Sequence, residues 1–398
     1  MKKAITLILL ILTFTTCLRA QKKELSQARS YIKSGKELNK AEQLMTDLLK
    51  QPDNRQNLKV HATLYDAVQA QYDEANKRFY LKQQQDTATF FKLVRRLYTV
   101  AETMDSVDAL PDTKGRVRPQ YRKTHAETLS RLMPNLYSGG AYFIRKQQWQ
   151  QSFDFYETYL DCFNQPLFAD VLTTAAADDK QQHARQLAAY WALYSAYLMH
   201  DPVRTLRHRD LALLEQSKRA NTLQYVAEAW NELKDDSSYV ATLTTGFNEF
   251  PRNTYFFPRL IDNYSAKRMY AEALDITDKA LESCDTCQLF LYAKASLLLN
   301  LGRNDEAIDY AKRVDGDVLH EANYTAAVAM MNKVSRLNEL SDKKQITALC
   351  SEAKPYMEAY RKQEPDAKDK WAPVLYRIYL NLNMGKEFDE IDQLLKRQ

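Results

Sequence analysis

Two cysteines form the most chemically suggestive motif of this chain, Cys284-Asp285-Thr286-Cys287. Thiol–disulfide oxidoreductases use this spacing at the start of a helix, where the helix dipole lowers the pKa of a thiol. In those enzymes the motif follows a strand of a βαβ unit, whereas here it lies in a turn between two helical patterns. Three interpretations stay open: a local disulfide between Cys284 and Cys287, two uninvolved thiols, and a redox-active or metal-binding pair.

Other catalytic patterns are incomplete. His208-Arg209-Asp210-Leu211 resembles a kinase catalytic loop, but Glu215 stands where that loop needs an asparagine, and no glycine-rich phosphate loop accompanies it. The six histidines are scattered, and none has the spacing of a zinc site. We therefore expect a protein that is not an enzyme, with no catalytic residues, no metal site and no cofactor.

The N-terminus has the pattern of an export signal. Lys2 and Lys3 precede an apolar to weakly polar stretch, Ala4–Thr16, and Leu18-Arg19-Ala20 offers a small residue before a cut that leaves Gln21 first. The alternative is a lipoprotein signal ending at Cys17, although a small residue is expected just before such a cysteine and Thr16 stands there. We expect a periplasmic, cell-surface or extracellular protein, associated with a membrane only if Cys17 is lipidated.

The charge balance gives no argument for nucleic acid as a partner. Removing the three basic residues of the signal from the chain's 56 leaves 53 against 51 acidic residues. One segment, 108–122, has a local excess of basic residues. Its prolines and glycine interrupt the helical patterns on either side. This loop is either a solvated connection or a contact for an anion or an acidic partner. Its cations, with one just beyond it, are Lys114, Arg116, Arg118, Arg122 and Lys123.

Helical patterns fill the rest of the chain. Only 8 glycines and 11 prolines occur among 398 residues, and 45% of the residues are hydrophobic, so a mostly helical protein with a continuous core is expected. Apolar periodicity predicts an irregular helix pair over 25–50 and two long helices over 58–84 and 87–107. Further pairs are expected over 134–164, 184–215, 321–360 and 371–397, with a loop or short capping helix over 168–182.

A regular repeat organises the stretch Leu223–Leu319. Tyr239, Ala273 and Ala307 are equally spaced, each in the second helix of a helix–turn–helix unit. Their spacing is that of the tetratricopeptide repeat (TPR) family, which this stretch resembles. Trp230 and Tyr264 stand at its aromatic position, Ala273 and Ala280 at its small positions, and Pro251 at its closing proline. Tyr239, Asp285 and Leu319 depart from the pattern, and the part of the chain before Arg131 matches weakly. The whole chain resembles exported repeat proteins of Bacteroidetes.

The resemblance implies a single all-α domain, a right-handed α–α superhelix of about eight helix pairs. The expected organisation is a signal over 1–20, irregular and long helix pairs over 21–107, a basic loop over 108–122, and TPR-like repeats over 123–398 that are continuous with the preceding helices and match best over 220–319. In this family, first helices line a concave groove that binds partners. The residues that the register places in the groove are Asn221, Gln224, Glu228, Asn231, Tyr255, Asp262, Ser265, Tyr292, Ser296 and Asn300.

A non-catalytic scaffold that binds a protein or peptide is the function that the resemblance implies. Carbohydrate or small-ligand binding in the same groove is an alternative, because tyrosines and amides would suit a sugar. A thiol–disulfide redox protein that uses Cys284 and Cys287 is another. One TPR subfamily grips a C-terminal carboxylate with groove lysines and arginines, but the residues placed in this groove include none, so that type of adaptor is not expected.

Overall fold

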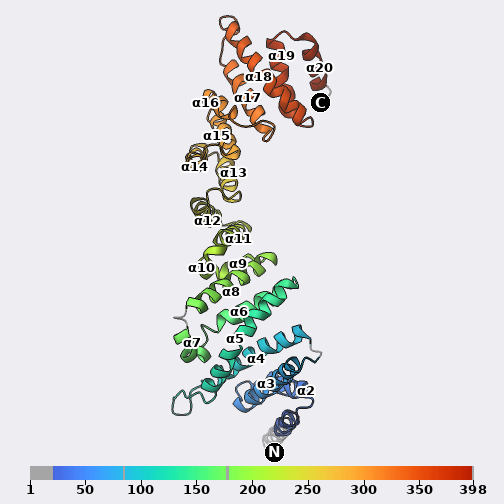
Figure 1. The fold of residues 1–398 in the computed structure, drawn as a ribbon, viewed down its shortest axis with the longest axis vertical. Helices are drawn as coiled ribbons and strands as arrows, with labels where there is room; N and C mark the ends of the chain where they lie inside the picture. The colour runs from blue at the N-terminus through green and yellow to red at the C-terminus, as the bar shows by residue number, and fades with distance from the viewer. Residues whose placement is uncertain (1–20, 84–85, 176–178, 397–398) are drawn as a thin grey trace, which may run out of the picture. The chain divides into compact units, whose positions relative to one another are not determined.

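The computed structural model describes residues 21–83, 86–175 and 179–396, with side chains omitted over 173–175. The predicted signal and Cys17 lie outside this range. Helices and connecting turns make up the described chain, and no strand occurs in it, which confirms the predicted all-α class (Figure 1). None of the described helices is both long and apolar enough to cross a membrane. The chain divides into two compact units, 1–234 and 235–398.

Unit 1 is a stack of helices in which neighbours along the chain pack on one another. Residues 21–34 form its first helix. Contacts then run from α2 to α3, α3 to α4, α4 to α5, α5 to α6, and α6 to α8. The bounds are α2 Leu38–Lys50, α3 Leu58–Tyr80, α4 Thr87–Asp108, α5 Arg122–Arg145, α6 Trp149–Asp161, α7 Ala169–Ala175, α8 Asp179–Leu198, α9 Pro202–Arg207, α10 Arg209–Ala212 and α11 Arg219–Glu232.

Unit 2 repeats the same arrangement. Each helix packs on the next, and α17 also contacts both α15 and α19, so the first helices of successive pairs form a layer of their own. This is the stacking of a helical-repeat protein, in which each pair buries its apolar face against its neighbours. The bounds are α12 Asp236–Glu249, α13 Phe256–Ala266, α14 Tyr270–Ser283, α15 Gln288–Asn300, α16 Asn304–Ala311, α17 Glu321–Val334, α18 Lys343–Gln363, α19 Lys368–Asn381 and α20 Gly385–Lys396.

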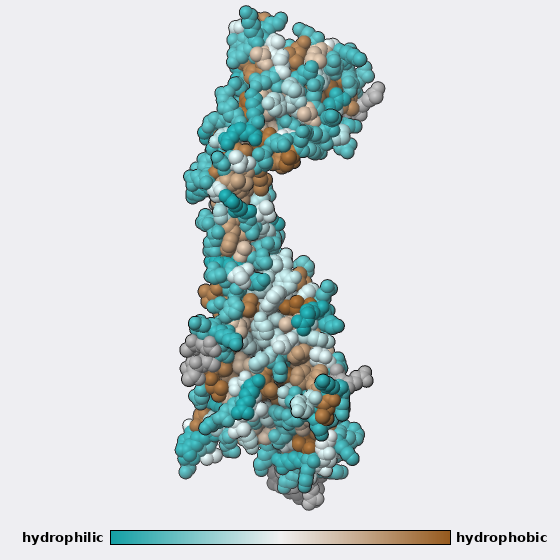
Figure 2. All heavy atoms as spheres, viewed as in Figure 1, coloured by the Kyte–Doolittle hydropathy of each residue, from teal (hydrophilic) through white to brown (hydrophobic). Residues whose placement is uncertain are grey.

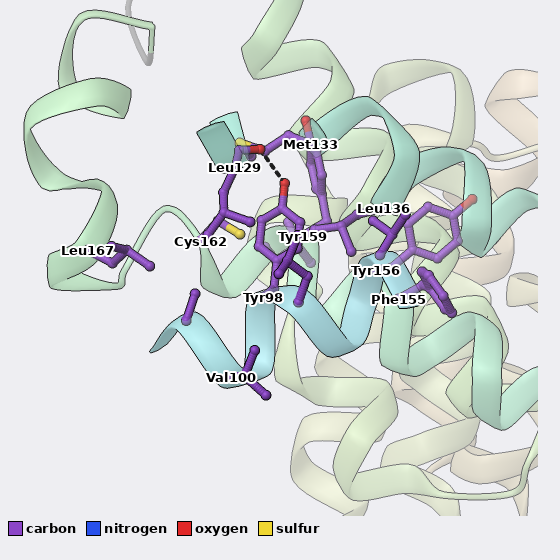
Figure 3. Close-up of a cluster of buried hydrophobic side chains, with 14 of the residues drawn as sticks. Tyr98, Val100, Leu129, Met133, Leu136, Phe155, Tyr156, Tyr159, Cys162 and Leu167 are labelled. Atoms are coloured by element: carbon purple, nitrogen blue, oxygen red, sulfur yellow. Dashed lines mark hydrogen bonds between the residues drawn. The ribbon is translucent and has the colours of Figure 1, made fainter. Parts of the chain in front are cut away.

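Large aromatic side chains fill the core of unit 1. Tyr98 of α4 is fully buried, and its hydroxyl donates a hydrogen bond of 2.5 Å to the carbonyl of Leu129 in α5 (Figure 3). Tyr156, also fully buried, belongs to the same cluster (Figure 3). The richness of the sequence in tyrosine therefore serves, in part, to pack these helices.

Small residues allow close helix contacts, as the sequence predicted. A Cβ atom on Gly139 would lie 2.6 Å from the ring of Phe155, and one on Gly140 would lie 2.6 Å from the ring of Tyr156. Ala273 and Ala280 of α14 are completely buried. At these positions a larger side chain would have to displace a neighbour.

A residue in the left-handed backbone conformation recurs in the turn inside each repeat, at the spacing of the sequence repeat. His200, Lys234, Arg268 and Gly302 all have positive φ, from 54° to 72°, and successive members of this set are one repeat apart. Each of these residues follows the first helix of its repeat. After Gly302, the backbone amide of Arg303 donates a hydrogen bond to the carbonyl of Leu298 at 2.9 Å. This hydrogen bond closes the helix end in a Schellman motif.

The structure differs from the expected organisation in two respects. Pro134 lies inside α5 instead of opening a helix; it is exposed, so water can solvate the backbone carbonyl that the missing N–H leaves unpaired. The chain also forms two compact units where one continuous domain was expected, and the boundary separates α11 from α12, which the repeat pattern had paired.

Candidate functional site

Four predicted groove residues lie along α11 at spacings that place them on one face of the helix. Asn221 and Asn231 are exposed, whereas Gln224 and Glu228 are half-buried. These residues belong to unit 1, whereas the predicted groove residues of α13 and α15 belong to unit 2.

In unit 2 the predicted residues differ in what they can offer a ligand. Asp262 and Asn300 are exposed, and Ser265, Tyr292 and Ser296 are half-buried. The Asn300 side chain donates to the carbonyl of Ser296 at 2.9 Å, within its own helix. Asn300 is on the surface, but this hydrogen bond already occupies part of its side-chain amide.

Tyr255 is a correction to the predicted groove. Its side chain is only 7% exposed. It precedes α13, where its ring meets the ring of Phe256 edge-on, and the guanidinium of Arg259 covers it with the central carbon 3.8 Å from the ring centroid. The repeat register counted it as a surface position, but the ring is part of the packing at the start of the helix.

An aromatic surface that the sequence reasoning missed lies on α6, α8 and α11 of unit 1. In Figure 2 the area over α8 to α11 is pale, the colour of intermediate hydropathy that tyrosine and tryptophan take. Tyr190 is buried, and the other members are half-buried, so ring edges reach the surface. We call this set the aromatic surface: Trp149, Tyr190, Trp191, Tyr194, Tyr197 and Tyr225.

The rings of the aromatic surface contact one another in a continuous series. The centroids of Tyr197 and Tyr225 are 4.5 Å apart with planes at 27°, which is a stacked pair across α8 and α11. Tyr194 lies 5.6 Å from Tyr225 and 6.2 Å from Trp149, the latter in an edge-on contact. Rings held by several neighbours lose little further conformational freedom when a ligand binds.

The phenol of Tyr225 stays neutral at physiological pH. Burial raises the pKa of Tyr225, and the nearby Tyr190, with which it shares a hydrogen bond, raises it further. Such phenols can donate and accept hydrogen bonds but cannot act as a base near pH 7. The arrangement therefore suits recognition and not proton transfer.

The repeat period could have found this surface in the sequence. One period before Gln224, Glu228 and Asn231 stand Tyr190, Tyr194 and Tyr197. The predicted groove began at α11, although its register continues into α8. Extending the register by one repeat identifies half of the aromatic surface.

A mostly apolar pocket of about 560 Å³ lies beside the aromatic surface, between α5, α6, α7 and α8. Tyr137 joins the two features, because it lines the pocket and its hydroxyl accepts a hydrogen bond from the indole N–H of Trp191. A pocket of this size could take one or two side chains of a bound peptide or a small apolar ligand. Its lining includes Met133, Pro134, Tyr137, Tyr159, Val171 and Leu172.

The surface of unit 2 carries a charge network instead. Glu321 of α17 accepts hydrogen bonds through Oε1 from Lys370 at 2.9 Å and from the Tyr360 hydroxyl at 2.8 Å. Burial and this carboxylate together raise the pKa of Tyr360 to about 12. Burial chiefly, and Glu321 next, raise the pKa of the predicted groove residue Tyr292. Because Glu321 neutralises Lys370, this lysine is not free to grip the carboxylate of a peptide.

Cys284 and Cys287 are free thiols in this structure, and a disulfide between them stays a prediction. Cys284 ends α14 and Cys287 precedes α15, and the backbone amide of Cys287 donates to the carbonyl of Cys284 at 3.4 Å. A hydrogen bond between the thiols lowers the pKa of Cys284 and raises that of Cys287. No cluster of three or more potential metal ligands occurs within the described residues.

Glu102 is the most perturbed carboxyl group of unit 1. Its Oε1 atom is buried with no hydrogen-bond partner. Burial, with a smaller contribution from Asp161, raises its pKa to about 7. Such a shift can mark a catalytic acid, but Glu102 does not line the apolar pocket. We attribute the shift to helix packing.

Comparisons with known proteins return only distant structural similarity. No family model and no curated protein matches the chain. The C-terminal part of a TPR repeat-containing protein from Cytophaga hutchinsonii is 11% identical, with a TM-score of 0.42, over 64% of this chain and 92% of that one. A TPR repeats protein from Bacteroides fragilis is 14% identical, with a TM-score of 0.29, over 67% and 98%. Yeast Tom70 is 10% identical, with a TM-score of 0.25, over 95% of each chain. The helical-repeat fold assigned above rests on the helices of this structure.

Proposed function

We propose that this protein is a non-catalytic scaffold of the bacterial cell envelope that binds a protein or peptide partner through the aromatic surface and its adjoining pocket. The observation that carries the proposal is the series of interlocked rings on α6, α8 and α11. Tyrosine and tryptophan are the side chains that most often anchor protein interfaces, because they bury a large area at a small entropic cost. The location in the envelope rests on the export signal read from the sequence.

The ring arrangement favours a peptide over a sugar. A sugar stacks on an open ring face, whereas Tyr197 and Tyr225 stack on each other and Tyr190 lies under the ammonium of Lys218, 5.8 Å from its ring centroid. The half-buried rings keep part of their surface accessible, and aliphatic or proline side chains can pack on it. The pocket beside Tyr137 can receive one further anchoring residue.

Site-specific photo-crosslinking in the native envelope tests the proposal. A photoreactive amino acid is placed at Tyr194 and, as a matched control, at the exposed Gln43 of α2. Protein adducts at position 194 that are absent at position 43, and that decline when Tyr197 is changed to Ala, are expected. Equal adducts at both positions would contradict the proposal. Quenching of tryptophan fluorescence by oligosaccharides, with no protein adducts, would assign the surface to sugars instead.

A further inference from the structure

The loop 109–121 between α4 and α5 projects from unit 1 and is firmly attached at both ends (Figure 1). The carboxylate of Asp108 accepts a hydrogen bond from the backbone amide of Tyr121 at 2.8 Å. Asp105 accepts two hydrogen bonds from the guanidinium of Arg122, both 2.8 Å long. Both aspartates are buried. These two negative charges therefore face inward and hold the base of the loop.

The tip of the loop is also structured. Asp112 accepts hydrogen bonds through Oδ1 from the backbone amides of Lys114 and Arg116, at 2.8 and 3.0 Å. Its other oxygen binds the Arg116 guanidinium at 2.7 and 2.9 Å. Gly115 has a φ of +74°, which a residue with a Cβ rarely adopts. The loop therefore presents its remaining side chains from a fixed turn.

Exposed cations and exposed apolar side chains lie along this loop and at Lys123, in the first turn of α5. Lys114, Arg118 and Lys123 are exposed, and none of them has an ion pair with a described residue. Exposed apolar groups accompany them in the loop: Leu110 is 44%, Val117 55% and Tyr121 37% exposed. A projecting segment that alternates cations with apolar groups is suited to the boundary between lipid headgroups and acyl chains.

We propose that loop 109–121 is a docking element for the surface of an anionic phospholipid membrane. Lys114, Arg118 and Lys123 would contact lipid phosphates, while Leu110 and Val117 enter the headgroup layer. A single discrete phosphate is a poorer fit. Arginine forks grip such an ion best, and those of Arg116 and Arg122 are already held by Asp112 and Asp105, which leaves a single arginine of the loop, Arg118, for this task. Isolated cations suit a diffuse negative surface.

The test is flotation of the mature protein with vesicles. Vesicles containing phosphatidylglycerol should bind it, with weaker binding at high salt, and pure phosphatidylcholine vesicles should not. Each cation removed should lower the partition coefficient about fivefold, so Lys114→Gln combined with Arg118→Gln should lower it roughly 25-fold. The control is Lys343→Gln with Lys344→Gln, two exposed lysines of α18, which should leave binding unchanged.

Further arms separate the apolar contribution, other anions and the proposed peptide site. Val117→Ser should weaken vesicle binding without changing its salt dependence. Inorganic phosphate at constant ionic strength should not compete with the vesicles for the protein. Tyr194→Ala should have no effect on vesicle binding. Equal binding to both vesicle types, or an unchanged Lys114→Gln/Arg118→Gln variant, would overturn the proposal. Binding to polyglutamate with no binding to vesicles would also overturn it and would assign the loop to an acidic protein.

Discussion

Tyr197 of α8 stacks on Tyr225 of α11, with ring centroids 4.5 Å apart. This pair joins the first helices of two successive repeats. Such pairs contribute about 0.5–1.5 kcal/mol beyond their buried area, so we expect Tyr197→Leu to lower the free energy of unfolding by about 1 kcal/mol. Chemical denaturation measures this, with Tyr80→Leu as the control, since Tyr80 is 86% exposed. Equal changes in both variants would show that the stacked pair adds nothing.

Gly140 should not tolerate a methyl group. Its Cβ would lie 2.6 Å from the ring of the fully buried Tyr156, so Gly140→Ala should overpack the contact between α5 and α6 and cost about 1–3 kcal/mol. Thermal unfolding of Gly140→Ala and Gly385→Ala checks this. Gly385 begins α20 with open space around it, so its variant should keep the wild-type melting temperature. A Gly140→Ala variant with the melting temperature of the wild type would show that α5 and α6 are not packed as closely as in this structure.

Glu102 should make the protein less stable as the pH rises. Burial raises its folded-state pKa to about 7, above the ordinary value of about 4.3. The folded protein then binds more protons than the unfolded chain between these values, so the free energy of unfolding falls as the pH rises through that window. Glu102→Gln should therefore stabilise the protein at pH 8, by about 1–3 kcal/mol, and change it little at pH 4. A benefit of equal size at both pH values would point to a cause other than ionisation.

Cys284 should be the first thiol to react. The hydrogen bond from Cys287 lowers the pKa of Cys284, while burial raises the pKa of Cys162 and of Cys350. Iodoacetamide at neutral pH followed by peptide mass spectrometry should find Cys284 modified first, with Cys162 and Cys350 protected until unfolding. Cys284→Ser should remove the fast phase. Equal labelling of all four thiols in the folded protein would contradict the prediction.

The parts of the fold that depend on local spacing could be predicted from the sequence. The small residues Ala273 and Ala280 marked the close contacts of α14, and both are fully buried. Tyr255 was placed wrongly because a register cannot show that Arg259 covers its ring. The division after Lys234 is a property of three-dimensional packing, which the local spacing of residues does not report. The aromatic surface was within reach of the sequence, because its three α8 tyrosines follow the predicted register.

The left-handed turns within the repeats have a consequence for how this sequence could change. Among the four turns that recur with the repeat, only Gly302 is a residue that adopts positive φ without steric cost, while His200, Lys234 and Arg268 each bear a Cβ there. That conformation costs an L-residue roughly 1 kcal/mol, so glycine at each of these turns would raise stability step by step. The stability gained from glycine at these turns would offset the stability lost through substitutions on the binding surfaces. Such substitutions could then be tolerated as the sequence evolves.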